Sequence, residues 1–338
     1  MTDTATAIPE TEMGTPIFQP GALNIVMSVP CPIKVKFKMV LETFINDYNA
    51  SHDMPIYCPS IMDGIPHGLE GILREVSDAE MLPDLWLSTS MRTALSQPFR
   101  SRFVDTGLLQ GINDDVSQFP SRFKEAATQY NLGFFAFGNW SLLCDLSVKT
   151  APPYPQTWED LLDPIYQGQI AIHGCHGEVG GMTLLQILHQ RYGDERICQL
   201  AQNIGGVRHF SKLIKAVDSN DKERVAYNIL PNAIINQLPS RKRAAIIELK
   251  DGPLLTPMTL FAKRDKLKQL QPIIDFLKGP DMTPVFSLGG FIKPELMDWS
   301  KPYLFPDWDI LLQTDHAKQS EHLNTTFIDA LAPGLMTV

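Results

Sequence analysis

The chain has 338 residues, of which 44% are hydrophobic and 20% are charged, and its formal net charge at pH 7 is -9. This length favours two domains with separate cores, and the composition is that of an ordinary globular protein rather than a disordered or membrane protein. An acidic chain without a clustered Lys/Arg footprint is a poor partner for a phosphate backbone, so we expect no nucleic-acid binding.

Residues 1–19, MTDTATAIPETEMGTPIFQ, are expected to form a flexible extension. They contain no basic segment, no apolar run of signal-peptide length and no small-residue cleavage site. No later segment has the roughly eighteen consecutive apolar residues of a membrane span. The sequence therefore favours a cytoplasmic protein without membrane insertion, or a periplasmic one if the chain is a trimmed mature form. The five cysteines are scattered, which indicates reduced thiols rather than a disulfide framework.

From Leu23 the pattern alternates strands and helices. The expected elements are strands at 23–29, 55–58 and 84–89, helices at 35–49, 68–76, 100–109 and 121–130, and a long aromatic strand at 133–146. Such alternation predicts βαβ units around a mostly parallel sheet. The long strand is a candidate for one that leaves one domain and enters the next.

The second half of the chain continues the alternation. A helical segment at 157–164 leads into an apolar strand at 169–174, and a glycine-rich turn then opens a helix near Met182. The elements expected after it are helices at 194–203, 211–218, 231–237 and 266–277, strands at 224–228 and 244–249, and a return strand at 254–264.

Four segments carry a resemblance to a known family. They are LPDLWLSTS (82–90), FVDTGLLQGI (103–112), TWEDLLDPIYQGQIAI (157–172) and the closing helix with its glycine stop (263–294). The third is similar to a "tW-dLldp-ykGkia" segment that is most typical of iron and small-anion binders. In this order the segments resemble the extracytoplasmic solute-binding proteins of ABC transporters, which have the type 2 periplasmic-binding-protein fold.

The resemblance implies an α/β fold of two lobes, each a mostly parallel sheet flanked by helices. Two crossing strands would join the lobes, and the ligand would lie in an interlobe cleft that closes about a hinge. With these crossings, lobe one is expected to comprise residues 20–135 and 256–338, and lobe two residues 136–255. In open α/β sheets, ligands meet the carboxyl ends of strands and the N-termini of helices.

The candidate ligand-binding residues lie on loops at those positions. They are Cys31, Cys58, Ser88, Thr89 and Ser90 in lobe one, and Asn139, Trp140, Gly177, Gly180, Gly181 and Tyr227 in lobe two. Glycines before a helix let backbone N–H groups approach an anion, although a tight turn that needs positive φ also explains them. The resemblance favours the anion because it independently places the ligand there.

The segment HGCHGE at 173–178 suggests a second kind of site. Thiolate and imidazole ligands select transition metals, so His173, Cys175, His176 and Glu178 are candidates to bind a transition metal or a metal-containing cofactor. The alternative is that the cysteine packs as a small hydrophobe and the histidines are solvated. The segment contains neither a CxxC pair nor an HExxH helix, so both interpretations stay open.

The leading hypothesis is a solute-binding protein for a small anion, a metal ion or a metal-containing cofactor, with a partner protein that receives the ligand as a further expectation. The rival is a cytoplasmic enzyme on the same fold, in which His173 and His176 activate Cys175 and Glu178 orients an imidazole. The pyrimidine synthases of thiamine biosynthesis, the chorismate-derived dehydratases and the porphobilinogen deaminases share this fold. The sequence lacks the clustered-cysteine motif typical of the first and a clear signature of the others, but its Cys/His content keeps iron-dependent chemistry open. The sequence favours the binding protein over the enzyme.

Overall fold

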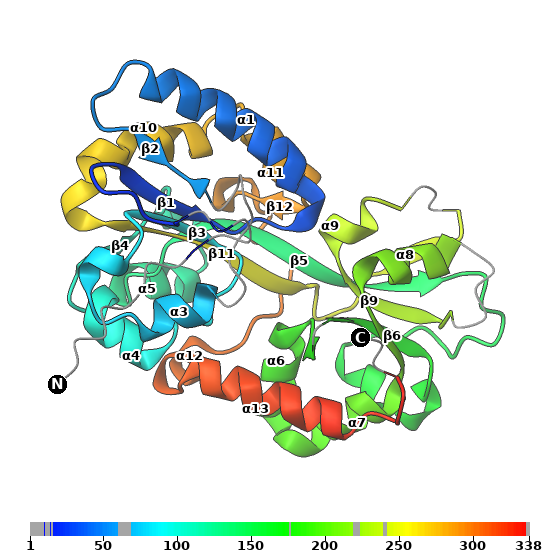
Figure 1. Ribbon diagram of the computed structural model, residues 1–338. Helices are drawn as coiled ribbons and strands as arrows, with labels where there is room; N and C mark the ends of the chain where they lie inside the picture. The colour runs from blue at the N-terminus through cyan, green and yellow to red at the C-terminus, as the bar shows by residue number, and fades with distance from the viewer. Residues whose placement is uncertain are drawn as a thin grey trace. The chain divides into compact units, whose positions relative to one another are not determined.

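The computed structural model describes residues 10, 14, 16–59, 69–175, 177–218, 224–238 and 242–335. The chain divides into two compact units (Figure 1). Unit 1 comprises Met1–Phe137 and Pro257–Met297, and unit 2 comprises Gly138–Thr256 and Asp298–Val338.

The units differ from the expected lobes in the C-terminal tail. Two boundaries, at 137/138 and 256/257, lie inside the long strands β5 (Phe134–Asp145) and β11 (Leu254–Lys263), close to the expected crossings. The third, at 297/298, was not expected, because the whole of 256–338 was assigned to lobe one. Residues 298–338 belong to unit 2 because Leu323 and Phe327, each 0% exposed, pack into the core of that unit.

Unit 1 is built on a mixed sheet of order β2-β1-β3-β11, with β4 paired to β11. Its strands are β1 (Leu23–Met27), β2 (Ile56–Tyr57), β3 (Leu85–Ser88), β4 (Leu109–Gly111), β12 (Phe291–Ile292) and parts of β5 and β11. Its helices are α1 (Cys31–Asn49), α3 (Leu69–Glu75), α4 (Gln97–Phe99), α5 (Ser121–Gln129), α10 (Leu267–Lys278) and α11 (Thr283–Leu288). The strands β1, β2 and β3 are parallel, whereas β11 runs antiparallel to β3.

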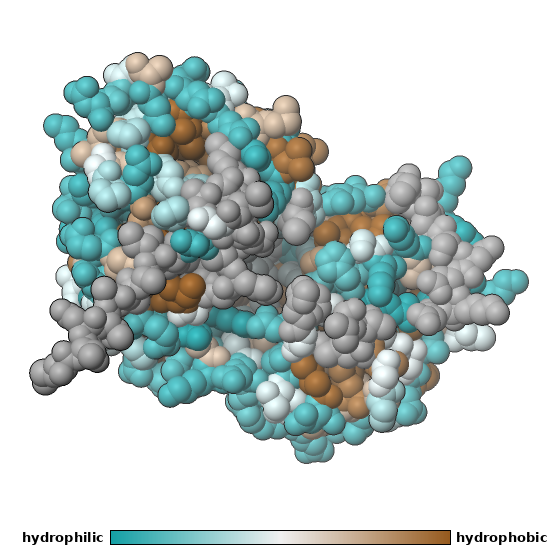
Figure 2. Space-filling view, viewed as in Figure 1, coloured by the Kyte–Doolittle hydropathy of each residue, from teal (hydrophilic) through white to brown (hydrophobic). Residues whose placement is uncertain are grey.

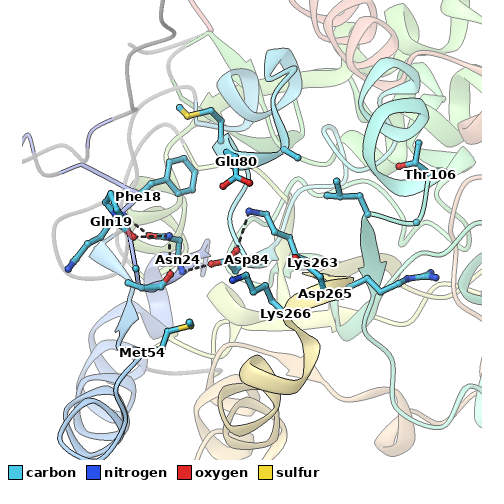
Figure 3. A pocket seen from close by; sticks show the side chains of 18 residues that line it. Phe18, Gln19, Asn24, Met54, Glu80, Asp84, Thr106, Lys263, Asp265 and Lys266 are labelled. Atoms are coloured by element: carbon cyan, nitrogen blue, oxygen red, sulfur yellow. Dashed lines mark hydrogen bonds and ion pairs between the residues drawn. The ribbon is translucent and has the colours of Figure 1, made fainter.

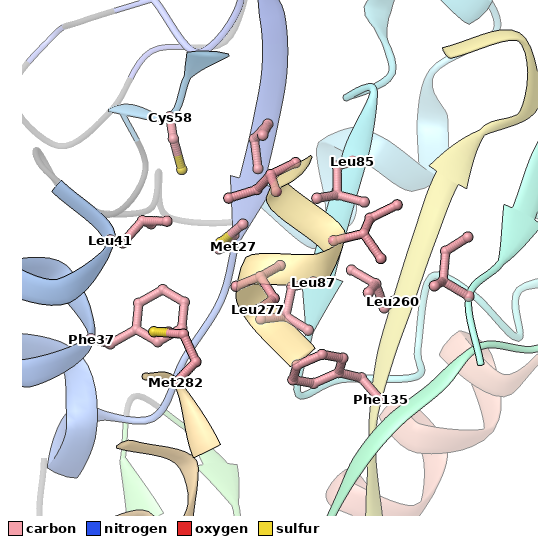
Figure 4. Packing of buried hydrophobic residues seen from close by; sticks show 14 of the residues in the cluster. Met27, Phe37, Leu41, Cys58, Leu85, Leu87, Phe135, Leu260, Leu277 and Met282 are labelled. Carbon is pink, nitrogen blue, oxygen red and sulfur yellow. The ribbon is translucent and has the colours of Figure 1, made fainter. Parts of the chain in front are cut away.

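The core of unit 1 lies between this sheet and the helices α1, α10 and α11 (Figure 4). Phe37 of α1 and Leu277 of α10, each 0% exposed, pack against strand residues such as Leu87. Other apolar side chains reach the surface on the helices: Met39 is 57% exposed and Leu288 64%, and they border a depression of about 660 Å³. Figure 2 shows hydrophobic residues at the surface beside α11.

Unit 2 has the strand order β5-β9-β6-β7, with β8 paired to β6 and β10 to β5. Its further strands are β6 (Ile170–Cys175), β7 (Glu178–Val179), β8 (Ile204–Arg208), β9 (Tyr227–Pro231) and β10 (Ala244–Ile247). Its helices are α6 (Met182–Tyr192), α7 (Asp194–Asn203), α8 (Phe210–Asp218), α9 (Asn232–Ile235), α12 (Trp308–Gln313) and α13 (His316–Asp329). Within this unit α13 packs on α6 and α7 (Figure 1).

The expected α/β class with helices flanking mostly parallel strands is confirmed. Several elements differ from their expected positions: α1 begins at Cys31 rather than 35, the strand expected at 224–228 is β9 at Tyr227–Pro231, and residues 157–164 form short 3₁₀ turns. The elements that were not predicted include the strands β4, β7, β8 and β12 and the helices α12 and α13. Among the described residues, no helix has the length and apolar character needed to cross a bilayer.

Candidate functional site

The carboxyl edge of the sheet in unit 2 gathers most of the residues predicted for lobe two. The strands β6, β8 and β9 are parallel, so their carboxyl ends meet at one edge. The strand β5 is antiparallel to β9 and pairs Trp140 with Pro231, so the first unit 2 residues of β5 lie at the same edge. The helices α6 and α8 begin just beyond it, as expected for a ligand site in an open α/β sheet.

The loop between β6 and α6 needs its glycines. Gly177 and Gly181 have φ values of +78° and +74°, which side chains rarely adopt. Gly180 is fixed by close approach instead, because an added Cβ would lie 2.6 Å from Trp140 Cη2 and 3.2 Å from His173 Cβ. Its N–H also donates to the His173 carbonyl at 2.8 Å. The three glycines thus set the path by which the chain enters α6.

The N-terminus of α6 presents backbone donors. No described residue accepts a hydrogen bond from the N–H groups of Gly181, Met182 or Thr183. The next donor, the Leu184 N–H, already bonds to the Gly181 carbonyl at 2.8 Å. Unused N–H groups at the start of a helix, reinforced by the helix dipole, can bind a carboxylate, phosphate or similar anion.

A side chain from the C-terminal tail forms hydrogen bonds to the loop between β6 and α6. Asn324 of α13 accepts a hydrogen bond from the Val179 N–H at 3.0 Å and donates one to the Gly177 carbonyl at 2.9 Å. Asn324 was not predicted from the sequence, because the tail was expected to belong to lobe one. The spacing of Leu323 and Phe327, four residues apart on a helix that Asp315 caps, was the signal that could have revealed a buried helix here.

His173, on β6, is packed against an aromatic ring. Its imidazole stacks on Phe210 with ring centroids 3.5 Å apart, and Phe210 lies 6.0 Å from the Trp140 ring. Burial is the main cause that lowers the pKa of His173 from 6.5 to about 4, while the hydrogen bond to the Arg208 carbonyl acts in the opposite direction. Since a carbonyl only accepts, Nδ1, 3.3 Å from that oxygen, carries the proton of the neutral ring and Nε2 does not.

The metal-ligating candidates are described only in part. His176 and the side chain of Cys175 lie outside the described residues, and Glu178 is exposed. The ladder between β6 and β7 pairs Cys175 with Glu178 in the backbone. Within the described part of the chain, no group of three or more His, Cys, Asp or Glu residues is arranged to bind a metal ion.

The other lobe-two candidates occupy different positions. Asn139, at the edge, is 9% exposed, and its Oδ1 has no hydrogen-bond partner among the described residues. Tyr227 instead begins β9, at the opposite end from the carboxyl edge, and is 0% exposed. Its hydroxyl donates to the Pro152 carbonyl at 2.7 Å, so this side chain serves the core of unit 2.

The lobe-one candidates lie at the carboxyl ends of strands in unit 1. The Ser88 hydroxyl accepts from the Ser90 N–H and donates to the Ser90 carbonyl, both at 3.0 Å, so it stabilises its own turn. Thr89 is partly buried between them. Cys58 is 5% exposed and packs in the unit 1 core, as expected of a cysteine that acts as a small hydrophobe. Cys31 begins α1, and its side chain lies outside the described residues.

A cavity of about 1030 Å³ lies at the opposite edge of the unit 1 sheet, where β1 and β3 begin (Figure 3). The ion pair between Lys263 and Asp84, 3.1 Å long, forms part of its wall, and Asp84 also accepts from the Asn24 N–H at 2.8 Å. These contacts join β1, β3 and β11. No residue predicted for the site lines this cavity, so we assign it no part in the proposed function.

Comparisons with solved structures agree with this fold. The ferric ion-binding protein A of Pasteurella haemolytica matches with a TM-score of 0.61 and 15% identity, over 90% of this chain and 96% of that one. AfuA of Actinobacillus pleuropneumoniae, with fructose-6-phosphate bound, gives 0.60 and 13%, over 93% and 99%. Trichodesmium IdiA (FutA), with iron and citrate, gives 0.61 and 12%, over 94% and 100%. No curated protein matches the sequence.

The sequence also matches a family model. The model for bacterial extracellular solute-binding proteins matches residues 80–314, which span parts of both units. The resemblance found in the sequence is therefore confirmed, together with the type 2 periplasmic-binding-protein fold that it implies. The chain belongs to the bacterial extracellular solute-binding protein family.

Proposed function

We propose that this solute-binding protein binds a small anion at the carboxyl edge of the unit 2 sheet. The observation that carries the proposal is the set of three N–H groups, from Gly181 to Thr183, that have no described acceptor at the start of α6. An eleven-residue helix adds its dipole to these donors. The loop is also held in place before any ligand arrives, by Asn324 and by the glycines, which lowers the cost of ordering it on binding.

The names of similar structures indicate which ligands to test. They include fructose-6-phosphate and citrate, both of which are anions, and also iron, which is bound together with citrate in one of them. The interlobe location of the ligand, hinge closure and transfer to a partner protein are parts of the same proposal. The cytoplasmic location stays a prediction, which cell fractionation would test against the extracellular description of the family.

Two glycine substitutions, one at the proposed site and one at the other end of β6 as a control, test the proposal. Gly181→Ala places a side chain at φ +74° beside the α6 donors, and Gly168→Ala places one at φ +70° before β6, at its amino end. Both substitutions impose a similar strain of about 1–2 kcal/mol. Only Gly181→Ala should weaken the binding of inorganic phosphate, sulfate or citrate, by about tenfold or more, in calorimetric titrations. Equal affinities in the two variants would refute the anion site.

A metal ion is the second candidate. The observation in its favour is the contact between His173 Nδ1 and the Arg208 carbonyl at 3.3 Å, because a neutral imidazole whose Nδ1 donates there can ligate a metal through Nε2. Cys175 lies two residues farther along β6 and is paired with Glu178. We expect that elemental analysis of anaerobically prepared protein would detect a transition metal, and that Cys175→Ser combined with His176→Gln would remove it. Metal-free, colourless protein that does not change on reconstitution would exclude this candidate.

The enzyme alternative has no observation of its own in the described residues. Its candidate nucleophile, Cys175, has no described side chain. The enzyme therefore stays a prediction from the sequence.

A further inference from the structure

Two asparagines at the carboxyl edge of unit 2 have buried side-chain oxygens that lack partners among the described residues. Asn139 on β5 is 9% exposed, and its Oδ1 accepts no hydrogen bond from any described residue. Asn232, the first residue of α9, is half-buried, and its Oδ1 is a buried atom that likewise has no described partner. The ladder between β5 and β9 ends with the pair Trp140 and Pro231; Asn139 comes directly before Trp140 and Asn232 directly after Pro231. The two amides therefore lie at the same end of one strand pair.

Such a pair is costly to the folded protein. More than nine in ten buried polar groups in native proteins have a hydrogen-bond partner. Each buried oxygen left without one reduces the folding equilibrium constant by roughly tenfold to a hundredfold. Turning the amide over does not remove the cost for Asn139, because no described residue is bonded to either end of it.

The fold satisfies a comparable asparagine elsewhere in unit 2. Asn203 is 3% exposed, and its Nδ2 donates to the carbonyls of Leu161 and Asp163, both at 2.8 Å. Asn139 is buried almost as deeply without any such bond. The difference between them is position, because Asn139 lies at the edge where the strand ends and the α6 donors gather.

We propose that Asn139 and Asn232 accept hydrogen bonds from a hydroxyl or amino group of the bound solute. This inference rests on the proposed function, in which the α6 donors bind the anionic group. The solute is then a small organic anion that carries at least one hydroxyl or amino substituent. The strands β5 and β6 flank β9, so they lie about 10 Å apart, two strand spacings, which a molecule of a few carbon atoms spans together with the side chains.

The first test compares two asparagine variants in protein freed of small molecules by dialysis. If Asn139 serves the ligand, Asn139→Leu removes an unsatisfied group and raises Tm by about 2–4 °C. Asn203→Leu breaks two hydrogen bonds and lowers Tm by a similar or larger amount. A lower Tm for Asn139→Leu would show that the amide has a structural partner, and would overturn the inference. Asn232→Leu, on a different element, provides the second variant with the same expectation.

The second test compares probes that differ only in hydroxyl groups. Succinate and malate differ by one hydroxyl group, and propyl phosphate and glycerol 3-phosphate differ by two. The wild-type protein should bind the hydroxylated member of at least one pair about tenfold more tightly, and Asn139→Leu should abolish that preference. No preference in either pair, or a preference that survives in Asn139→Leu, overturns the inference. Failure of the anion site is seen separately, as equal phosphate affinities in Gly181→Ala and Gly168→Ala.

Discussion

The carboxyl edges of the two sheets use their polar groups in different ways. In unit 1 the Ser88 hydroxyl, at the end of β3, is satisfied twice by the backbone of Ser90. In unit 2 the Oδ1 atoms of Asn139 and Asn232 have no described partner, and neither do the first N–H groups of α6. Polar groups at the unit 1 edge therefore stabilise the turn that carries them, whereas those at the unit 2 edge are available to a ligand. In the proposed anion site, most of the chemical specificity therefore comes from unit 2.

The largest expected effect concerns how the C-terminal tail supports that edge. Phe327→Ala in α13 and Phe286→Ala in α11 each remove a ring from a core, with exposures of 0% and 1%. Each substitution should lower the free energy of unfolding of its unit by about 3–5 kcal/mol. Only Phe327→Ala should speed amide hydrogen exchange in the loop before α6, because α13 carries Asn324. The same loop protection in both variants would contradict the assignment of the tail to the site.

The sequence predicted the parts of unit 2 in which local pattern and position agree. Gly181 and Met182 mark the start of α6, and the helix expected at 194–203 is α7 with the same bounds. Short-range signals, a left-handed glycine before an apolar helical repeat and Asp194 in the first turn, determine both elements. The same signals located the glycine loop at a strand's carboxyl end.

Other parts depended on contacts that no local pattern contains. The strand β8, IGGVR, was missed because two of its five residues are glycines, which have low strand propensity. The tail was placed in the wrong unit because the packing partners of Leu323 lie more than a hundred residues earlier in the chain, on helices such as α6. The unsatisfied state of Asn139 is likewise a property of its surroundings. The sequence selected this residue from its loop position and the family resemblance alone.

The next largest expected effect is a dependence of the protein's stability on pH. The pKa of His173 is lowered, chiefly by burial, from 6.5 to about 4, so between these values the unfolded chain binds a proton that the folded protein does not. Stability should therefore fall as the pH decreases from about 6.5 to about 4, by at most about 3 kcal/mol and by less because the ring is partly exposed.

Substitution of His173 should remove this dependence. His173→Phe keeps a ring to stack on Phe210 but does not titrate, so its Tm should vary less between pH 6.5 and pH 4 than that of the wild type. Thermal melts across this range provide the measurement. If the Tm of the variant falls as steeply as that of the wild type, other groups cause the pH dependence. His173 would then not be a buried imidazole with a lowered pKa.

Two matched asparagines test whether the loop support is specific to binding. Asn324 bridges the Val179 N–H and the Gly177 carbonyl in unit 2, and Asn113 bridges the Phe134 N–H and the Leu132 carbonyl in unit 1. Replacement of either asparagine by Ala should lower the free energy of unfolding by about 1–3 kcal/mol, because two backbone groups lose a hydrogen-bond partner. Only Asn324→Ala should also weaken the binding of inorganic phosphate, measured by titration calorimetry. Equal affinities in the two variants would limit Asn324 to a structural role.

The smallest effect should come from the exposed histidine–aspartate hydrogen bonds that link α13 to its neighbours. Asp194 lies 2.9 Å from both His189 Nδ1 and His322 Nε2, and its side chain is 44% exposed. Burial raises the pKa of this carboxyl, but the hydrogen bonds from His322 and His189 outweigh it, and the net pKa lies below 3.8.

Such a carboxylate stabilises the fold above the unfolded-state pKa, and this contribution is lost as the pH falls through the lower folded-state value. Asp194→Asn should therefore lower stability at pH 7 by less than about 1 kcal/mol, since exposed pairs are weak, and the difference from the wild type should shrink in acid. A larger loss, seen in thermal melts at pH 7, would mean that this cluster, rather than Leu323 and Phe327, holds α13 in unit 2.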